Sequence, residues 1–327
     1  GIDENEHFIV TWSGYGSGDV NGGVLMGPFC LGGGIILCNG LVGYWELDEA
    51  SGSTVASDSS GSGNNGTLTD MDPANDWVPG HIEGALDFDG VDDIISVGAL
   101  ANLDDVFGGG GTVTAWIYPR GMGASNAGRV VDKWNSNTNG WLLTLYGTNQ
   151  SLLVQRGFSG AVGTWHTAAN SIQVDTWQLV AVVYDDGSDA NDPVLYIDGT
   201  PQAVTEWFTP SGTSGSDAGI DLNIGNRSIS TSRAFDGMLD DVRVYNRVLN
   251  AGEITLLHAL TEGGCSGSGG GGSDTDPPTP DPMTWASPPA PDILTSIVMM
   301  ATTATDPSGV EYYFECTAGG GNDSGWQ

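Results

Sequence analysis

Short apolar runs that alternate with turn residues fill residues 41–262, and this pattern constrains the fold more than any other feature of the chain. Aromatic and β-branched residues dominate the runs, while Gly, Asn and Asp separate them, as in β-strands joined by tight turns. The clearest runs are LVGYWEL, GTVTAWIYP, GWLLTLYG, WQLVAVVYD, DPVLYIDGTP, IDLNIGN and LDDVRVYN. So many short strands in one block of this size predict an all-β sandwich or barrel.

One helix is predicted at the end of this block. Asn250 precedes the stretch AGEITLLHAL, and Glu253 follows three residues later. An Asn at the N-cap and an acid at the third helical position can each accept a hydrogen bond from the other's backbone N–H, which makes a capping box. We therefore expect a helix to begin directly after Asn250.

Composition divides the rest of the chain into three segments. Residues 1–40 hold 11 glycines and a strand-like HFIVTW, which predicts a Gly-rich extended arm. Residues 263–282 read GGCSGSGGGGSDTDPPTPDP, a linker that is first Gly/Ser-rich and then Pro-rich. Residues 283–327 hold three strand-like runs, too few to cover both faces of a sheet, so they predict a partial β domain.

Charge excludes several classes of partner. The chain carries 41 acidic against 8 basic side chains, a formal net charge of -33. A protein that binds the phosphate backbone of nucleic acid needs clustered Lys and Arg, so we expect no nucleic-acid partner. No apolar run approaches the roughly 20 residues that span a bilayer, so we expect no membrane insertion. The acids predict a solvated outer surface or carboxylates gathered round hard cations.

The cysteines favour an exported protein. The chain has four of them, Cys30, Cys38, Cys265 and Cys316, and none forms a CxxC pair with metal-ligand spacing. An even set of this kind is typical of disulfides in secreted proteins, so we expect a secreted, extracellular or cell-surface location. Cys30 and Cys38 flank LGGGIIL and could close a hairpin. A pairing of Cys265 with Cys316 follows only by elimination.

The middle block resembles the laminin-G-like (concanavalin-A-like) jelly roll of large secreted bacterial proteins. The matching stretches are LVGYWELDEASGSTVASDSSGSGNNGTL, WVPGHIEGALDFDGVDDIISV, VTAWIYP, WQLVAVVYD, LYIDG and FDGMLDDVRVYNRVLNAGEITLL. The last segment resembles a fibronectin-III or immunoglobulin-like repeat through DPMTWASPP and DPSGVEYYFEC. The resemblance implies a jelly-roll sandwich over residues 41–262, followed by a partial repeat over residues 283–327.

The same resemblance implies a structural calcium ion. Its first and last strands lie side by side, which brings WELDE next to LDDVRVY and the loop SDSSGSGNNGTL. Ca²⁺ prefers six to eight oxygens from carboxylates, amides and backbone carbonyls. The predicted ligands are Asp58, Asn65, Asp240, a backbone oxygen near Gly66, and Asp48. The alternative is that Asp58 and Asn64 form Asx-turns.

An echo of the last strand occurs earlier in the chain. FDGVDDIISV at 88–97 resembles FDGMLDDVRVY at 235–245. We interpret Asp89 and Gly90 as a tight turn before the next strand, and we expect Asp92 and Asp93 to be solvated.

Catalysis is not expected. The acids of ELDE at 46–49 invite comparison with glycosidases of this fold, which need two carboxylates on one cleft. One retaining family places three acids at alternate positions of one strand, but the third of these positions is Ala50 here. No nucleophile motif occurs, and no histidine has the setting of a catalytic base.

Two functions from different classes remain. In the first, the chain is a non-catalytic structural or adhesive subunit that polymerises with itself by strand or arm exchange. The strand around Phe8, Ile9 and Val10 would then add to a neighbour's edge around Tyr313 and Phe314. In the second, the jelly roll is a carbohydrate-binding module that binds glycans through exposed aromatic residues. The candidates for that role are Trp134, Trp141, Trp165, Trp207 and Phe208.

Overall fold

The computed structural model of the chain describes residues 7–11, 37–147, 149–227, 232–260, 285–291, 297–301 and 313–318. The chain divides into two compact units. One comprises Leu37–Gly267, and the other comprises Gly1–Ile36 with Ser268–Gln327. The larger unit contains residues 41–262, the block predicted as a jelly roll.

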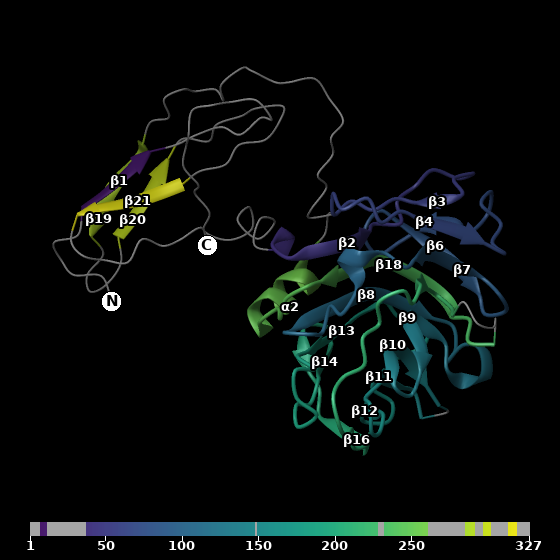
Figure 1. The fold of residues 1–327 in the computed structure, drawn as a ribbon. Coiled ribbons are helices and arrows are strands. Elements are labelled where there is room, and N and C mark those ends of the chain that lie inside the picture. Colours follow the sequence, from purple (N-terminus) through teal and green to yellow (C-terminus); the bar gives the residue numbers. More distant parts are fainter. Residues whose placement is uncertain are drawn as a thin grey trace. The chain divides into compact units, whose positions relative to one another are not determined.

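Two antiparallel sheets form the larger unit (Figure 1). The nine-stranded sheet has the order β16-β12-β11-β10-β9-β17-β7-β4-β3. Its strands are β16 (Val204–Phe208), β12 (Gly163–Thr167), β11 (Ser151–Arg156), β10 (Asn139–Tyr146), β9 (Arg129–Ser136), β17 (Leu222–Ile224), β7 (Ile94–Gly98), β4 (Gly66–Thr69) and β3 (Val55–Ala56).

The second sheet has eight strands in the order β15-β14-β13-β8-β18-β6-β5, with β2 also paired to β18. Its strands are β15 (Thr200–Pro201), β14 (Val194–Ile197), β13 (Gln178–Tyr184), β8 (Gly111–Pro119), β18 (Asp236–Tyr245), β6 (Gly84–Asp89), β5 (Trp77–Pro79) and β2 (Leu41–Trp45). Helical segments include η1 (Ala101–Leu103), η2 (Ala124–Asn126) and α2 (Ala251–Ala259). The predicted all-β sandwich is thus confirmed.

Alternation along the strands builds the core between the two sheets. Val113, Ala115 and Ile117 of β8 enter the same apolar cluster as Leu143 and Val154 of the opposite sheet. The intervening residues of the eight-stranded sheet form a second cluster with Ile254 and Leu257 of α2. The helix therefore covers the outer face of that sheet.

The capping box predicted for α2 is confirmed. The Asn250 side chain accepts a hydrogen bond from the Glu253 N–H at 3.0 Å, and the Asn250 N–H donates to the Glu253 carboxylate at 2.7 Å. Asn250 and Glu253 therefore form both hydrogen bonds that the sequence predicted for the start of the helix.

The first and last strands of the unit pair with each other, as the resemblance implied. Val242 lies opposite Trp45, and Val244 lies opposite Gly43. The two FDG stretches also meet, because Gly237 of β18 lies opposite Phe88 of β6. Phe88 and Phe235 then pack edge to face, with 6.3 Å between ring centroids. The repeated stretch thus builds two neighbouring strands of one sheet.

Asp-Gly has a different role in each stretch. Gly90 has a φ of 79° and lies in the loop between β6 and β7, as expected for a turn. Gly237 lies inside β18, and a Cβ there would come within 2.1 Å of the Tyr118 carbonyl oxygen. Its glycine is needed for close approach of the neighbouring strand rather than for a turn.

The smaller unit contains four described strands. β1 (His7–Thr11) pairs antiparallel with β21 (Tyr313–Ala318), and β19 (Trp285–Pro291) pairs antiparallel with β20 (Ile297–Ala301). The strand predicted as a donor to a neighbouring chain therefore pairs within its own chain, with Val10 opposite Phe314 and Thr11 opposite Tyr313. The resemblance of this segment to a fibronectin or immunoglobulin repeat stays a prediction.

Candidate functional site

Asp58 organises the loop that leads into β4. Its carboxylate accepts hydrogen bonds from three backbone N–H groups, those of Tyr44 at 2.9 Å, Ser60 at 2.9 Å and Asn64 at 2.7 Å. The Asn65 side-chain oxygen accepts from the Asp58 N–H at 2.8 Å. The contact with Ser60 is the Asx-turn that the sequence offered as the alternative. Most of the acceptor capacity of this carboxylate is already used by the backbone.

Asp48 and Asp240 bind a different loop, residues 80–84. Asp48 accepts a hydrogen bond from the Gly84 N–H, and Asp240 accepts from the N–H groups of His81 and Ile82. Burial raises the pKa of Asp240 to about 8, and its Oδ1 has no partner among the described residues.

The predicted calcium ligands therefore fall into two groups. Asp58 and Asn65 lie in the loop that leads to Gly66 at the start of β4. Asp48 and Asp240 lie near each other beside the loop of residues 80–84. The pairing of β18 with β8 shifts register between Asp240 and Arg243, and Asp241 has a φ of 53°. Calcium at this predicted set stays a prediction.

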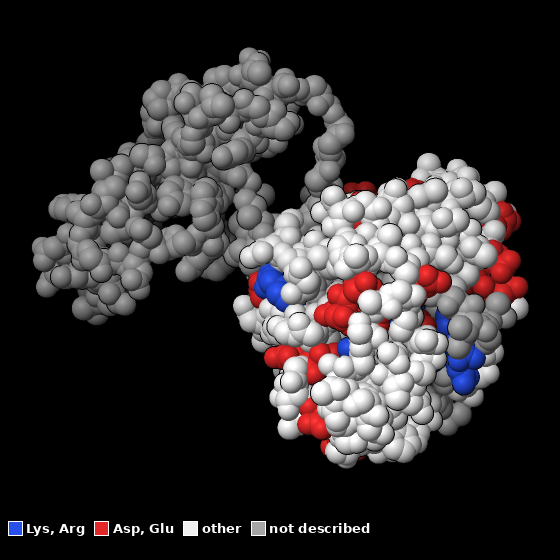
Figure 2. Space-filling model, viewed as in Figure 1, with Lys and Arg blue, Asp and Glu red and all other residues white. Residues whose placement is uncertain are grey.

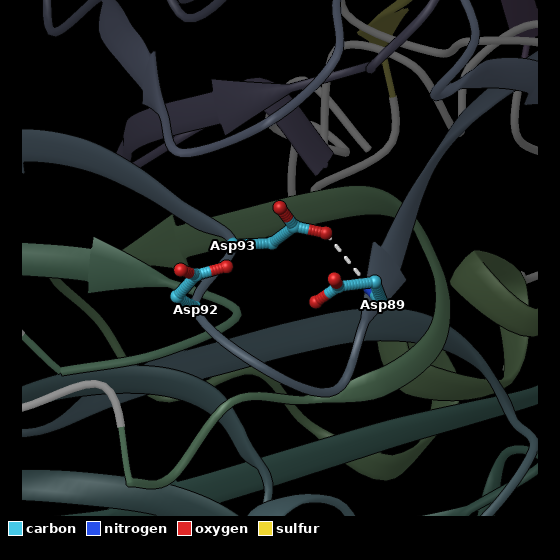
Figure 3. A group of neighbouring side chains, drawn as sticks. All are labelled: Asp89, Asp92 and Asp93. Carbon is cyan, nitrogen blue, oxygen red and sulfur yellow. Dashed lines mark hydrogen bonds between the residues drawn. The ribbon is translucent and has the colours of Figure 1, made fainter.

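A different acidic group is more compact. Among the described residues, Asp89, Asp92 and Asp93 form the one group of three acidic, His or Cys side chains whose ligand atoms all lie within 4.8 Å of one another (Figure 3). Asp93 accepts a hydrogen bond from the Asp89 N–H at 2.7 Å. It is 3% exposed, and burial raises its pKa to about 7. The expectation that Asp93 is solvated was wrong, since the hairpin turns it inward.

The three acids that resemble a glycosidase motif, Glu46, Asp48 and Glu49, form hydrogen bonds with backbone N–H groups and a serine hydroxyl. Glu46 accepts a hydrogen bond from the Ser59 hydroxyl at 2.6 Å, and Glu49 accepts from the Ser57 N–H at 2.5 Å. With Asp48 bound to Gly84, each of the three acids has a structural contact.

A buried ionic network at one end of the sandwich was missed by the sequence analysis. Lys133, the sole lysine, has a fully buried side chain whose ammonium donates to Asp104 and Asp217 at 2.9 Å. Arg156 pairs with Asp186 at 2.5 Å, and both side chains are buried. Such a network connects loops that are distant in sequence. Removal of one partner leaves a buried charge unpaired and strongly destabilises the folded protein. Its members come from distant parts of the chain, so no local sequence motif predicts it.

The outer face of the nine-stranded sheet, which points away from the other sheet, is polar. Two rows across this face follow from the strand registers: Arg129, Thr144, Leu153, His166 and Thr205, and then Asn223, Asp132, Leu142, Gln155, Thr164 and Phe208. The Gln155 amide donates to the Thr164 hydroxyl at 3.0 Å, in keeping with their common face. Most polar side chains in these rows are buried, but Gln155 and His166 are partly exposed.

Aromatic side chains gather at the β16 edge of this face. Trp207 and Phe208 are 47% and 49% exposed, and their rings stack with 5.2 Å between centroids. Trp207 also lies 5.4 Å from the Tyr146 ring and 6.1 Å from the His166 ring. We call these four residues the aromatic cluster. Tyr146 and Trp207 come from strands separated by β11 and β12, so their rings meet across two intervening strands.

The five aromatic residues proposed from the sequence as sugar contacts differ in their exposure. Trp141 and Trp165 are fully buried in the core, so their expected exposure was wrong. Trp207 and Phe208 are exposed, as a binding platform requires. Trp134 is half-buried and follows Asp132 by two residues in β9, on the same face of the sheet.

Comparison with known proteins agrees with this architecture. A family model for the concanavalin A-like lectin/glucanases superfamily matches residues 89–255, about half of the chain. The chain belongs to this superfamily. No curated protein matches the sequence. Within the described residues of this superfamily member, no helix is long and apolar enough to cross a membrane.

The chain is similar to two solved structures at low sequence identity. The binding domain of Paraclostridial Mosquitocidal Protein 1 is 18% identical, with a TM-score of 0.51 over 68% of this chain and 52% of that one. This chain thus spans about half of that binding domain. Domain 4 of an extracellular arabinanase from Geobacillus stearothermophilus, solved with arabinotriose, is 18% identical, with a TM-score of 0.44 over 67% of this chain and 98% of that one.

Proposed function

We propose that the unit Leu37–Gly267 is a non-catalytic carbohydrate-binding module of an extracellular protein. The observation that carries this proposal is the aromatic cluster on the outer face of the nine-stranded sheet. Trp207 and Phe208 expose about half of their surface side by side. Adjacent exposed aromatic rings on a soluble domain mark a binding surface, and the apolar face of a sugar ring fits them.

Polar groups beside the cluster supply the directional contacts that a sugar needs. Gln155 lies in the row that ends at Phe208, His166 lies against Trp207, and both side chains are partly exposed. Binding sites for small ligands combine apolar and aromatic surface with a few placed polar groups. These residues stand on strands rather than on loops, so their geometry is fixed before the ligand arrives.

Binding to a glycan array tests the proposal directly. The full chain should bind a defined subset of saccharides, and Trp207→Ala should lose that binding. Trp177→Ala is the matched control, because Trp177 is a half-buried tryptophan that packs with the α2 side of the other sheet. Absence of saccharide binding by the full chain, or equal loss in both variants, would contradict the proposal.

A second candidate function is self-assembly into filaments or a surface layer. The pairing of β1 with β21 favours it in one respect, because it shows that the two terminal strands are complementary. The same antiparallel pairing made between chains would be heterologous and would propagate. Removing residues 1–36 should then abolish assembly in light scattering, and normal assembly of the shortened chain would exclude this role for β1.

A further inference from the structure

The sole lysine of the chain is buried against two aspartates. Lys133 has a fully buried side chain, and its Nζ lies 2.9 Å from Oδ1 of Asp217 and 2.9 Å from Oδ1 of Asp104. It also donates to the backbone carbonyl oxygen of Asp217 at 2.7 Å. Asp217 is fully buried as well, whereas the side chain of Asp104 is 21% exposed. An amine is therefore fixed in contact with a buried carboxyl group and with a second, partly exposed one.

This lysine is an exception among the buried basic residues. The described part of the chain buries three others, Arg129, Arg156 and Arg243, and each pairs with an aspartate at 2.5–3.0 Å. Basic side chains are also few on the visible face of the described unit, where acidic ones cover much of the surface (Figure 2). Arginine suits a buried ion pair well, because its guanidinium is planar, weakly hydrated and always charged. Lysine differs in that its amine can lose a proton and act as a nucleophile.

The carboxyl group of Asp217 is arranged to accept such a nucleophile. Its Oδ1 accepts hydrogen bonds from Lys133 and from the Asp105 N–H, the latter at 2.8 Å. Its Oδ2 is buried with no hydrogen-bond partner among the described residues, and Nη1 of Arg156 lies 3.8 Å from it. Negative charge develops on a carboxyl oxygen when an amine attacks its carbon, and a guanidinium held nearby stabilises that charge. Burial also raises the pKa of Asp217, which favours the protonated and more electrophilic carboxyl group.

Burial favours condensation of the two groups. In water, an ammonium and a carboxylate are well hydrated and do not combine. Inside the protein both have lost that hydration, and a neutral amide avoids the free-energy cost of two buried charges. The fold also holds the reactants in contact, which is equivalent to an effective concentration of about 10⁵–10⁸ M. The reaction is therefore expected in the folded chain and not in the unfolded one.

We propose that Lys133 and Asp217 condense to an intramolecular isopeptide bond, which joins β9 covalently to the loop before β17. The lone pair of Nζ forms a bond with Cγ of Asp217, the bond from Cγ to Oδ1 breaks, and this oxygen leaves as water. Of the three ammonium protons, one stays on the amide nitrogen and two leave in the water. Asp104 accepts a proton from the ammonium and returns it to the departing oxygen. No oxidant or other reactant is consumed, and Oδ2 remains as the amide oxygen.

The bond is independent of the proposed carbohydrate binding. Trp141, which lies opposite Lys133, packs in the core between the sheets, whereas the aromatic cluster lies on the outer face. Failure of either proposal therefore leaves the other intact. A bond between residues 133 and 217 also closes a long loop, and this restricts the unfolded chain as a disulfide does.

Intact-mass spectrometry of the reduced and denatured full chain tests the proposal. The measured mass should be lower than the mass calculated from the sequence by one water molecule. Digestion should release a branched peptide that contains both Lys133 and Asp217. The full calculated mass in the intact chain, or two separate linear peptides, would overturn the proposal.

Variants separate the isopeptide bond from other losses of water. Lys133→Arg should show its full calculated mass, because a guanidinium does not form the amide. Asp217→Asn should lose ammonia instead of water, since the leaving group is then the amide nitrogen. Asp104→Asn should keep its full calculated mass, whereas the exposed Asp221→Asn should lose water like the intact chain. A loss of water that persists in Lys133→Arg would assign it to a cyclic imide at an Asp-Gly step and would overturn the isopeptide bond.

Discussion

Four carboxyl groups with raised pKa values make the stability of the folded chain depend on pH. Burial raises the pKa of Asp48 and Asp132 to about 6, of Asp93 to about 7 and of Asp240 to about 8. Between its ordinary pKa and the raised one, each group holds a proton in the folded chain that the unfolded chain has lost. The unfolded state then binds fewer protons, so stability falls as pH rises through this window.

The melting temperature should therefore be higher at pH 5 than at pH 8. Asp240→Asn should flatten this dependence, because an amide keeps the neutral form at every pH. The exposed Asp221→Asn serves as the control and should leave the slope unchanged. Differential scanning calorimetry across this range measures the effect, and a melting temperature that rises toward pH 8 would contradict it.

The expected calcium site also depends on a few residues. We expect Ca²⁺ to stabilise the larger unit, and the compact group Asp89, Asp92 and Asp93 fits the ion better than the predicted set, since its oxygens converge. At a hundredfold excess over its dissociation constant, a ligand of the folded state adds about 2.7 kcal/mol, or roughly 5–10 °C in a unit of this size.

Chelation should lower the melting temperature, and Asp92→Asn should abolish the difference. Asp58→Asn distinguishes the two sets: if it alone abolishes the calcium effect, the ligands predicted from the sequence hold the ion. An identical melting curve with and without chelator would exclude a structural calcium in either place.

At the scale of elements, the capping box of α2 offers a direct test of a structure predicted from a few adjacent residues. Asn250→Ala removes the side-chain acceptor of the capping box and should lower the free energy of unfolding by about 1 kcal/mol. Thr255→Ala is the control, because Thr255 is an exposed residue in the middle of α2. Urea denaturation measures both, and equal losses would show that the cap contributes nothing.

Strand positions and the helix start were predictable, because they follow from alternation and capping within a few residues. The pairing details were not. The register shift after Asp240, the inward turn of Asp93 and the pairing of the two FDG stretches depend on neighbours more than a hundred residues away or on a local bulge. A two-residue period in one strand carries no information about such an interruption.

At the scale of the whole molecule, the candidate site was only partly visible in the sequence. Trp207 and Phe208 could be named, but Trp141 and Trp165 are equally aromatic and are buried. Exposure is decided by which face of which sheet a strand presents.

The most direct test of a carbohydrate-binding face is the affinity of Trp207→Ala for the saccharide that the intact chain binds best, measured by isothermal titration calorimetry. Truncating a central aromatic residue of a binding site costs about 2 kcal/mol or more, so the dissociation constant should rise about 30-fold. Trp177→Ala should bind like the intact chain. An unchanged affinity in Trp207→Ala would show that the sugar lies elsewhere and that this face is not the binding site.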